Sequence, residues 1–141
     1  MTTSRVDTTI AQPGQSLTTG HKTFSIVDLM LYGAATWDWH RLHYDSEYTS
    51  RMQLPGPVVD GQIYGALFAR QAVDAFGPTA FVRKLEFRMR AMVFAGETVQ
   101  IDGVVHEVRH DPDADLVVLD QTLTRDGRPV ADARTEVRVP R

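Results

Sequence analysis

The spacing of apolar residues changes period near the middle of the chain. Apolar residues recur at near-helical intervals from Ile26 to about Ala35, and the segment from Gly61 to Phe76 carries its polar side chains on about half of a helical circumference. From Phe81 onward, apolar and polar residues alternate, as they do in strands with one buried face. We therefore predict an α+β domain, in which an antiparallel β-sheet covers one long, largely apolar helix.

Local signals predict where the helices begin and end. Ser25 and Asp28 have the spacing of a capping box at the start of the first helix. Asp60 is the predicted N-cap of the second helix, and Gly77-Pro78 supplies its stop. The segment 38–57 is dense in polar residues and is predicted to be a long structured loop.

Four strands are expected after the helices. Gly103 is predicted to mark a β-bulge, and Asp126-Gly127 is a strong signal for a hairpin turn. A four- or five-stranded sheet around a single helix leaves an edge and a face open, so we expect a homodimer, or a higher or hetero-oligomer. The predicted strands cover 81 to about 91, 98–109, 116–124 and 130–139.

Composition narrows the class of protein. The 141 residues suit one domain at 16–141, preceded by a flexible tail at 1–15 that is rich in small and polar residues. The net charge of -3 argues against a nucleic-acid partner, and the absence of cysteine excludes disulfides and a thiol nucleophile. Because no apolar run is long enough to cross a bilayer, we expect no membrane partner and a cytoplasmic location.

The candidate chemistry lies in the predicted loop. Asp38 and His43 are five residues apart, which places them on one face of neither a helix nor a strand, so they can converge only through a turn. A carboxylate beside an imidazole can move protons at neutral pH. Two other interpretations are open: the pair could brace the loop by bonding to its backbone, or His40, His43 and Asp45 could bind a metal ion.

Three motifs point to a known family. The first is an Asp-x-x-x-x-His motif followed closely by Asp, at Asp38-Trp39-His40-Arg41-Leu42-His43-Tyr44-Asp45. The second is an apolar loop that leads to a glycine at the start of the long helix, at Pro57-Val58-Val59-Asp60-Gly61-Gln62, and the third is Gly96-Glu97-Thr98 after a strand. With the order of elements over 24–139, these motifs resemble the MaoC-like family of hot dog fold hydratases and dehydratases, which includes the (R)-specific enoyl-CoA hydratases.

The resemblance implies a single hot dog fold and an enzymatic reaction. The reaction is reversible addition of water to a trans-2-enoyl thioester of coenzyme A or acyl carrier protein, which gives an (R)-3-hydroxyacyl thioester and makes the chain a lyase of fatty acid metabolism. The family's roles fall on Asp38 and His43 for proton transfer, and on the backbone N–H of Gly61 as the donor to the thioester oxygen. No metal or redox cofactor is implied.

Six further residues are expected to bind the substrate. The aromatic ones would line the acyl chain and the arginines would meet the phosphates of coenzyme A, although core packing and a solvated strand face are the simpler alternatives. The chain has Asp60 where the family usually has histidine, and His40-Arg41 where it usually has Asn-Pro, so substrate preference does not carry over. The six are Trp39, Asp60, Tyr64, Phe68, Arg88 and Arg90.

Two other functions fit the same sequence. A hot dog thioesterase would act on similar thioesters with a carboxylate near the start of the long helix, and Asp60 is compatible with that chemistry. The chain could also be one subunit of a hetero-oligomer, in which another hot dog chain completes the acyl pocket. Release of a free thiol would identify the thioesterase, whereas a hydratase leaves the thioester intact.

Overall fold

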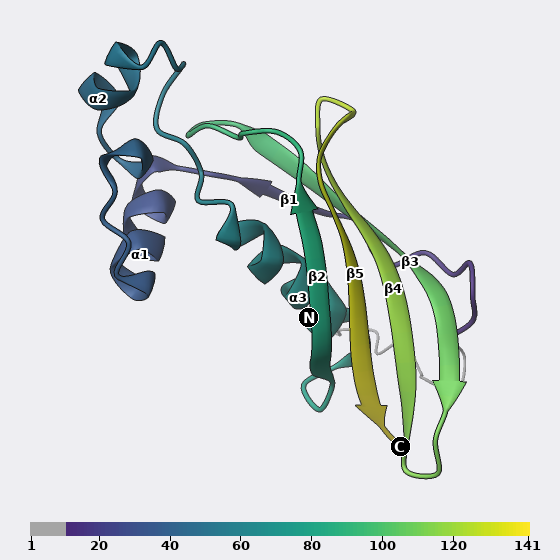
Figure 1. The fold of residues 1–141 in the computed structure, drawn as a ribbon. Coiled ribbons are helices and arrows are strands. Elements are labelled where there is room, and N and C mark those ends of the chain that lie inside the picture. Colours follow the sequence, from purple (N-terminus) through teal and green to yellow (C-terminus); the bar gives the residue numbers. More distant parts are fainter. Residues whose placement is uncertain (1–10) are drawn as a thin grey trace.

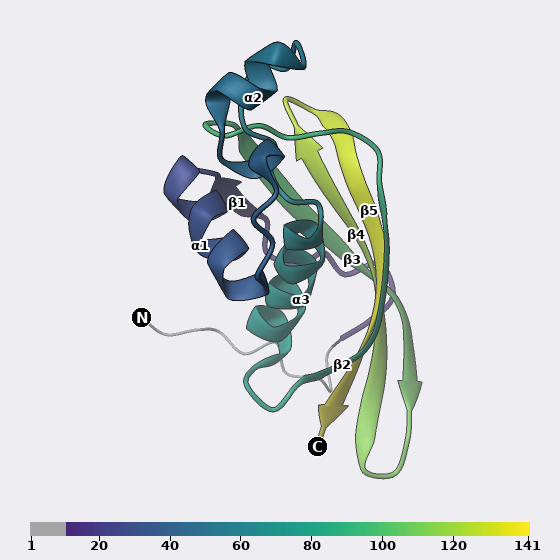
Figure 2. The ribbon, with the colours of Figure 1, turned by 60° about the vertical axis from the view of Figure 1, so that its left-hand side comes forward.

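The computed structural model of the protein describes residues 11–141, whose five strands form one antiparallel sheet in the order β1-β3-β4-β5-β2. The helices lie on one face of this sheet, with α3 against it and α1 and α2 beyond α3 (Figures 1 and 2). No helix in this part of the chain is long and apolar enough to span a bilayer. In chain order the elements are β1 (Gly20–Thr23), α1 (Ile26–Thr36), a 3₁₀ turn (Arg41–His43), α2 (Ser46–Arg51), α3 (Gln62–Phe76), β2 (Phe81–Met89), β3 (Thr98–His110), β4 (Ala114–Arg125) and β5 (Arg128–Pro140).

Helix α1 starts at the predicted capping box. The Ser25 hydroxyl accepts a hydrogen bond from the Asp28 backbone N–H at 3.1 Å, and the Asp28 carboxylate accepts one from the Ser25 backbone N–H at 2.8 Å. The backbone and hydroxyl hydrogen bonds from Ser25 hold the pKa of Asp28 below its usual value. The prediction of this helix start is confirmed, because capping depends on neighbours in the sequence.

We expect the Ser25→Ala variant to lower the free energy of unfolding by about 1 kcal/mol, since it leaves the Asp28 N–H without its acceptor. Urea denaturation followed by circular dichroism measures this change. Ser50→Ala is the matched control, because Ser50 is exposed on α2, and it should shift stability by less than about 0.5 kcal/mol. Equal losses in the two variants would contradict the role of the cap.

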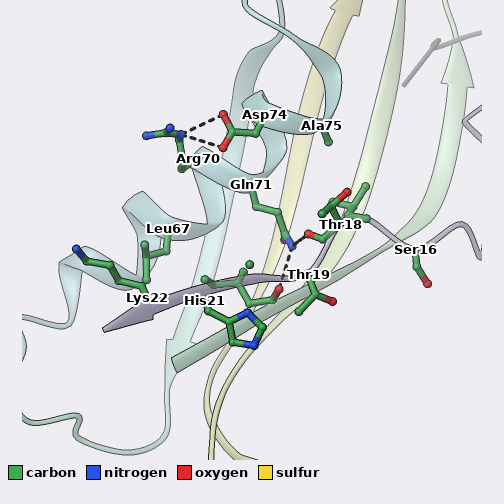
Figure 3. Close-up of a pocket in the computed structure, with 13 residues that line it drawn as sticks. Ser16, Thr18, Thr19, His21, Lys22, Leu67, Arg70, Gln71, Asp74 and Ala75 are labelled. Carbon is green, nitrogen blue, oxygen red and sulfur yellow. Dashed lines mark hydrogen bonds and ion pairs between the residues drawn. The ribbon is translucent and has the colours of Figure 1, made fainter. Parts of the chain in front are cut away.

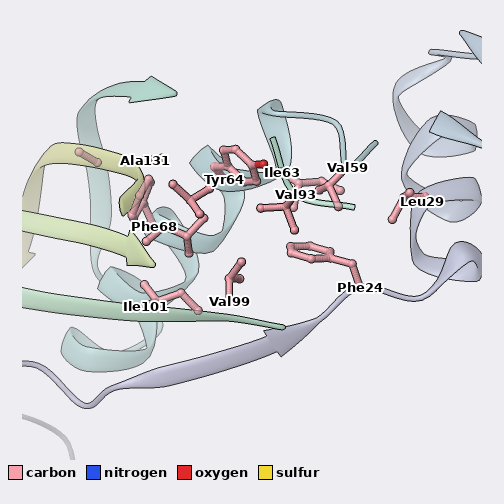
Figure 4. Packing of buried hydrophobic residues seen from close by; sticks show 13 residues of the cluster. Phe24, Leu29, Val59, Ile63, Tyr64, Phe68, Val93, Val99, Ile101 and Ala131 are labelled. Carbon is pink, nitrogen blue, oxygen red and sulfur yellow. The ribbon is translucent and has the colours of Figure 1, made fainter. Parts of the chain in front are cut away.

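Helix α3 is held against the sheet by apolar packing and one buried polar contact. Tyr64 and Phe68 are almost fully buried in the cluster shown in Figure 4, and α3 contacts β2, β3 and β5. Gly65 permits close approach, because a Cβ there would lie 2.9 Å from the Phe87 ring. On β4, the Gln121 side-chain amide donates to the Phe68 carbonyl at 2.9 Å. These contacts fix α3 on the sheet and so position the residues that precede it.

Strand β1 precedes the helices, so the prediction that all strands follow them was wrong. Its four residues, Gly20–Thr23, have no apolar alternation, and they pair with Thr98–Ile101 of β3. Because the pairing partner lies far along the chain, the local apolar pattern carries no signal for this strand.

The predicted tail is ordered in its last part. The Gly14 N–H donates to the Val105 carbonyl at 2.7 Å, and the Val105 N–H donates to the Gln15 carbonyl at 2.8 Å. The side chain of Ala11 is buried. The prediction of a flexible tail was therefore wrong for residues 11–15, while its residues 1–10 lie outside the described part of the chain.

The segment between α1 and α3 is ordered, as predicted, but it is more than a loop. It contains the 3₁₀ turn and α2, which the sequence did not predict. The Asp45 carboxylate starts α2 by accepting from the Tyr48 N–H at 3.0 Å, and it also pairs with Arg41 at 2.8 Å. These short helices satisfy backbone groups of a polar segment by local hydrogen bonds.

One turn prediction is confirmed and one bulge prediction is wrong. Asp126 and Gly127 join β4 and β5 with positive φ angles of 50° and 73°, as a two-residue hairpin turn requires. The irregularity in β3 lies between Val105 and Glu107 rather than at Gly103. Gly103 serves close packing instead, since a Cβ there would lie 2.8 Å from the side-chain oxygen of Gln71.

Candidate active site

Asp38 is positioned by the sharp end of α1. Trp37 adopts the left-handed conformation, with φ 58° and ψ 32°, and the Asp38 N–H donates back to the Gly33 carbonyl at 3.0 Å. A residue with a side chain does not fit at Gly33 in this turn, because its Cβ would lie 2.7 Å from the Asp38 carbonyl oxygen. A left-handed conformation at a non-glycine residue costs about 1–2 kcal/mol, which the surrounding contacts offset.

His43 ends the 3₁₀ turn, and its ring is held by the loop that leads to α3. Its Nδ1 lies 2.7 Å from the Val58 carbonyl oxygen, and the Val58 N–H donates to the Leu42 carbonyl at 2.9 Å. Because a carbonyl only accepts hydrogen bonds, Nδ1 carries the proton and neutral His43 presents an unprotonated Nε2. This Nε2 can therefore accept a proton or bind a cation.

The turn brings Asp38 and His43 together, as the sequence predicts. His43 Nε2 lies 3.9 Å from Asp38 Oδ2, which is too long for a direct hydrogen bond but leaves room for one water molecule to contact both. The side chain of His43 is 16% exposed and that of Asp38 is 41% exposed. Asp60 joins them, and one ligand atom from each of the three side chains lies within 4.8 Å of the other two.

Gly61 occupies the N-cap position of α3, one residue later than predicted for Asp60. The Asp60 carboxylate still accepts from the Gln62 N–H at 2.9 Å, so it satisfies one of the free amides at the helix start. Within residues 11–141, the Gly61 N–H has no hydrogen-bond acceptor. A Cβ at Gly61 would lie 2.0 Å from the Met89 sulfur, so this position accepts no larger side chain without rearrangement.

An open cavity of about 400 Å³ joins His43 to Gly61. Asp38 and Asp60 do not line it themselves, but they adjoin it through His43 and Gly61. Most of its lining is apolar, which suits a hydrophobic acyl group. The lining residues are Leu42, His43, Val58, Val59, Gly61, Tyr64, Met89, Arg90, Ala91 and Met92.

Two tyrosines next to the site stay uncharged at neutral pH. Burial raises the pKa of Tyr64 to about 12. Burial also raises the pKa of Tyr32, and the negative charge of Asp60 adds to that effect. Tyr64 thus contributes a neutral wall to the cavity, and proton transfer near neutral pH falls to the imidazole and carboxylates.

The six predicted substrate-binding residues lie in different environments. Tyr64 and Arg90 line the cavity, and Asp60 lies beside it. Phe68 is fully buried in the core, and Trp39 is half exposed and packs edge-on against Trp37.

The two predicted arginines also differ. Arg88 lines a separate, charged hollow on the sheet together with Asp120 and Asp132. Arg90 lines the cavity, but it already forms an ion pair with Asp132. Phe68, Trp39 and Arg88 therefore do not line this cavity. The alternation along strands and the period of the helix could not predict this, because neither pattern shows where a cavity forms.

Another hollow lies between the later part of α3 and β1 (Figure 3). Its volume is about 590 Å³, which is larger than the cavity at His43. Gln71 anchors its wall by donating to the Thr18 carbonyl at 3.1 Å, and Arg70 pairs with Asp74 at its rim. Its lining does not include Asp38, His43 or Gly61, so size alone does not identify the reactive site.

The alternative metal site at His40, His43 and Asp45 is not formed. His40 Nδ1 accepts from the Leu42 N–H at 3.1 Å, and Asp45 is engaged by Tyr48 and Arg41. Within the described residues, the cluster with metal-ligand spacing is Asp38, His43 and Asp60 instead. The sequence offered little signal for this set, because Asp60 lies seventeen positions beyond His43 and reaches it only through the fold.

Comparisons with known proteins agree on the family and the fold. The MaoC like domain matches residues 8–125, whereas no curated protein matches the chain. The (R)-hydratase from A. caviae involved in PHA biosynthesis is 20% identical with a TM-score of 0.85, over 93% of this chain and 98% of that one.

Two complexes from Mycobacterium tuberculosis contain similar chains. A chain of the ChsH1-ChsH2 complex is 18% identical with a TM-score of 0.84, over 92% of this chain and 99% of that one. A chain of the HadBC (3R-hydroxyacyl-ACP dehydratase) complex is 18% identical with a TM-score of 0.75, over 89% and 96%. At these identities the similarity establishes the fold, a five-stranded antiparallel sheet with few helices as in hot dog proteins. The MaoC like domain matches most of the length of this chain, and the chain therefore belongs to the MaoC-like domain family.

Proposed function

We propose that the protein is a hydratase or dehydratase that interconverts a trans-2-enoyl thioester and an (R)-3-hydroxyacyl thioester. The observation that carries the proposal is the arrangement around one cavity, where the unprotonated Nε2 of His43 lies 3.9 Å from Asp38 and where the Gly61 backbone N–H has no acceptor among the described residues. These are the groups that addition of water to a conjugated thioester requires. The family and the (R)-hydratase fold support the same reaction class.

The proposed mechanism uses one water molecule between the pair. His43 Nε2, with Asp38, takes a proton from the water as its oxygen bonds to the β-carbon of the enoyl group. The electron pair of the double bond shifts toward the thioester, and His43 then returns the proton to the α-carbon. The Gly61 N–H, at the positive end of α3, stabilises the negative charge that develops on the thioester oxygen. The resulting product keeps its thioester bond.

The experiment that tests this proposal is a two-channel assay with crotonyl-CoA. We expect the absorbance of the conjugated enoyl thioester to fall while no free thiol appears, because water adds to carbon and the thioester survives. Chiral analysis of the product should give the R isomer. Thiol release at the rate of absorbance loss would instead support a thioesterase, for which Asp60 beside the cavity would be the candidate carboxylate.

We also propose that a second copy of the chain covers the free edge of β2. Among the described strands β2 pairs only with β5, and Phe81, Met89 and Met92 are exposed along or next to it. Met89 and Met92 also line the cavity, so a chain on this edge would close the cavity to water. Sedimentation analysis should give twice the chain mass, and a monomer at micromolar concentration would favour a partner of different sequence.

A further inference from the structure

The chain carries a third ligating side chain next to the proposed acid-base pair. We propose that Asp38, His43 and Asp60 form a binding site for a borderline divalent cation such as Zn²⁺, and that the bound cation blocks the proposed hydration. One imidazole nitrogen and two carboxylate oxygens lie within 4.8 Å of one another, and they come from the end of α1, the 3₁₀ turn and the residue before Gly61. The binding site itself does not depend on the proposed hydratase reaction, but the inhibition by the bound cation does.

Each of the three side chains is oriented by its other polar atom. His43 Nδ1–H donates to the Val58 carbonyl at 2.7 Å, which leaves Nε2 as the free donor atom for a metal. One Asp60 oxygen accepts from the Gln62 N–H at 2.9 Å, and Asp38 Oδ1 accepts from the His40 N–H at 3.2 Å. Metal-binding imidazoles almost always have such a second partner, because it selects the tautomer and holds the ring in place.

The charge balance of the cluster also favours a cation. Among residues 11–141, neither Asp38 nor Asp60 forms an ion pair with a lysine or an arginine. Arg90, the arginine on the cavity wall, is paired with Asp132. Two carboxylates this close repel each other, and a divalent cation between them removes that repulsion.

The donor set selects the class of cation. One imidazole nitrogen with two carboxylate oxygens suits Zn²⁺ and its first-row neighbours, whereas Mg²⁺ and Ca²⁺ prefer all-oxygen sites. Tetrahedral Zn²⁺ with bonds of about 2.0–2.2 Å needs its ligand atoms about 3.4 Å apart. The separation of 3.9 Å between His43 Nε2 and Asp38 Oδ2 therefore has to shorten by about half an ångström, which the half-exposed Asp38 side chain can supply by rotating.

Occupation of the site has a direct consequence for the proposed reaction. A cation on His43 Nε2 takes the electron pair that would otherwise accept the proton of water. It also places positive charge where the proposed water molecule sits between His43 and Asp38.

Calorimetric titration of the metal-free, full-length protein with Zn²⁺ tests the binding site. We expect one site per chain that Asp60→Asn weakens by at least 10-fold, while that variant keeps an acceptor for the Gln62 N–H. Asp38→Asn, in the connection after α1, should weaken it similarly and serves as a second variant if the first is unstable. The matched control is His106→Gln, which removes an exposed His–Asp pair at 2.9 Å on the sheet and should leave the site intact.

The outcomes separate the cation site from the reaction. Zn²⁺ binding that is unchanged in both aspartate variants, or that is lost in His106→Gln, would overturn the proposed site. If Zn²⁺ binds as expected, it should inhibit the hydration of crotonyl-CoA reversibly, with activity restored by EDTA and with Mg²⁺ having no such effect. Full hydration activity in a protein saturated with Zn²⁺ would overturn the proposed inhibition. Failure of the hydratase reaction itself would appear as inactive metal-free protein and would leave the calorimetric result standing.

Discussion

Asp38→Ala and His43→Ala are each expected to lower the rate of crotonyl-CoA hydration by a factor of about 100 to 10,000. Asp38→Ala removes the carboxylate that lies 3.9 Å from Nε2, so the water loses one of its two contacts. His43→Ala removes the group that accepts the proton, and it also frees the Val58 carbonyl from its hydrogen bond. The loss should appear mainly in kcat, because both groups act on the reacting water rather than on the acyl chain.

Two control variants remove the same types of side chain, a histidine and an aspartate, at positions outside the site. His106→Ala removes a half-exposed histidine on β3, and Asp74→Ala removes an exposed carboxylate on α3. Both should retain activity close to that of the unchanged protein, and thermal denaturation should confirm that all four variants are folded. Wild-type rates in Asp38→Ala and His43→Ala would show that the pair only braces the loop, which is the alternative that the sequence left open.

The second large effect is expected from one methyl group at the start of α3. Gly61→Ala should lower kcat/KM by roughly 100-fold, since a displacement of about 1 Å is sufficient to misplace a bound substrate. The added Cβ would lie 2.0 Å from the Met89 sulfur, so the exposed Met89 side chain has to turn away from its present position. Both Gly61 and Met89 line the cavity, so the displacement changes its shape directly.

A matched glycine distinguishes this effect from a general cost of adding a side chain. Gly56→Ala lies in the same connection before α3, and a Cβ there would meet nothing within 4 Å, so its kinetics should not change. Adding Met89→Ala to Gly61→Ala removes the clashing atoms and should restore part of the lost activity. Because alanine keeps the backbone N–H, unchanged kinetics in Gly61→Ala would mean that the contact with Met89 does not control the position of the substrate.

Local sequence signals were sufficient for most of the fold. The capping box at Ser25, the period of α3 and the Asp126-Gly127 turn each depend on residues that are close in the sequence, and the structure confirms them. The expected family follows from motifs of the same local kind and is confirmed by the match over residues 8–125. Strand β1 and the ordered residues 11–15 were not predicted, because β3 supplies their hydrogen bonds from far along the chain.

The residues of the site also separate into those that the sequence predicted and those that only the structure identified. The sequence by itself determined that Asp38 and His43 could meet only through a turn, because neither a helix nor a strand could bring side chains five residues apart to one point. Only the tertiary structure decided that Asp60 joins them, that Phe68 belongs to the core and that Tyr64 lines the cavity. The physical reason is that a cavity forms between segments that are distant in the sequence, and hydrogen bonds of Val58 with Leu42 and with the His43 imidazole hold the loop before α3 against His43.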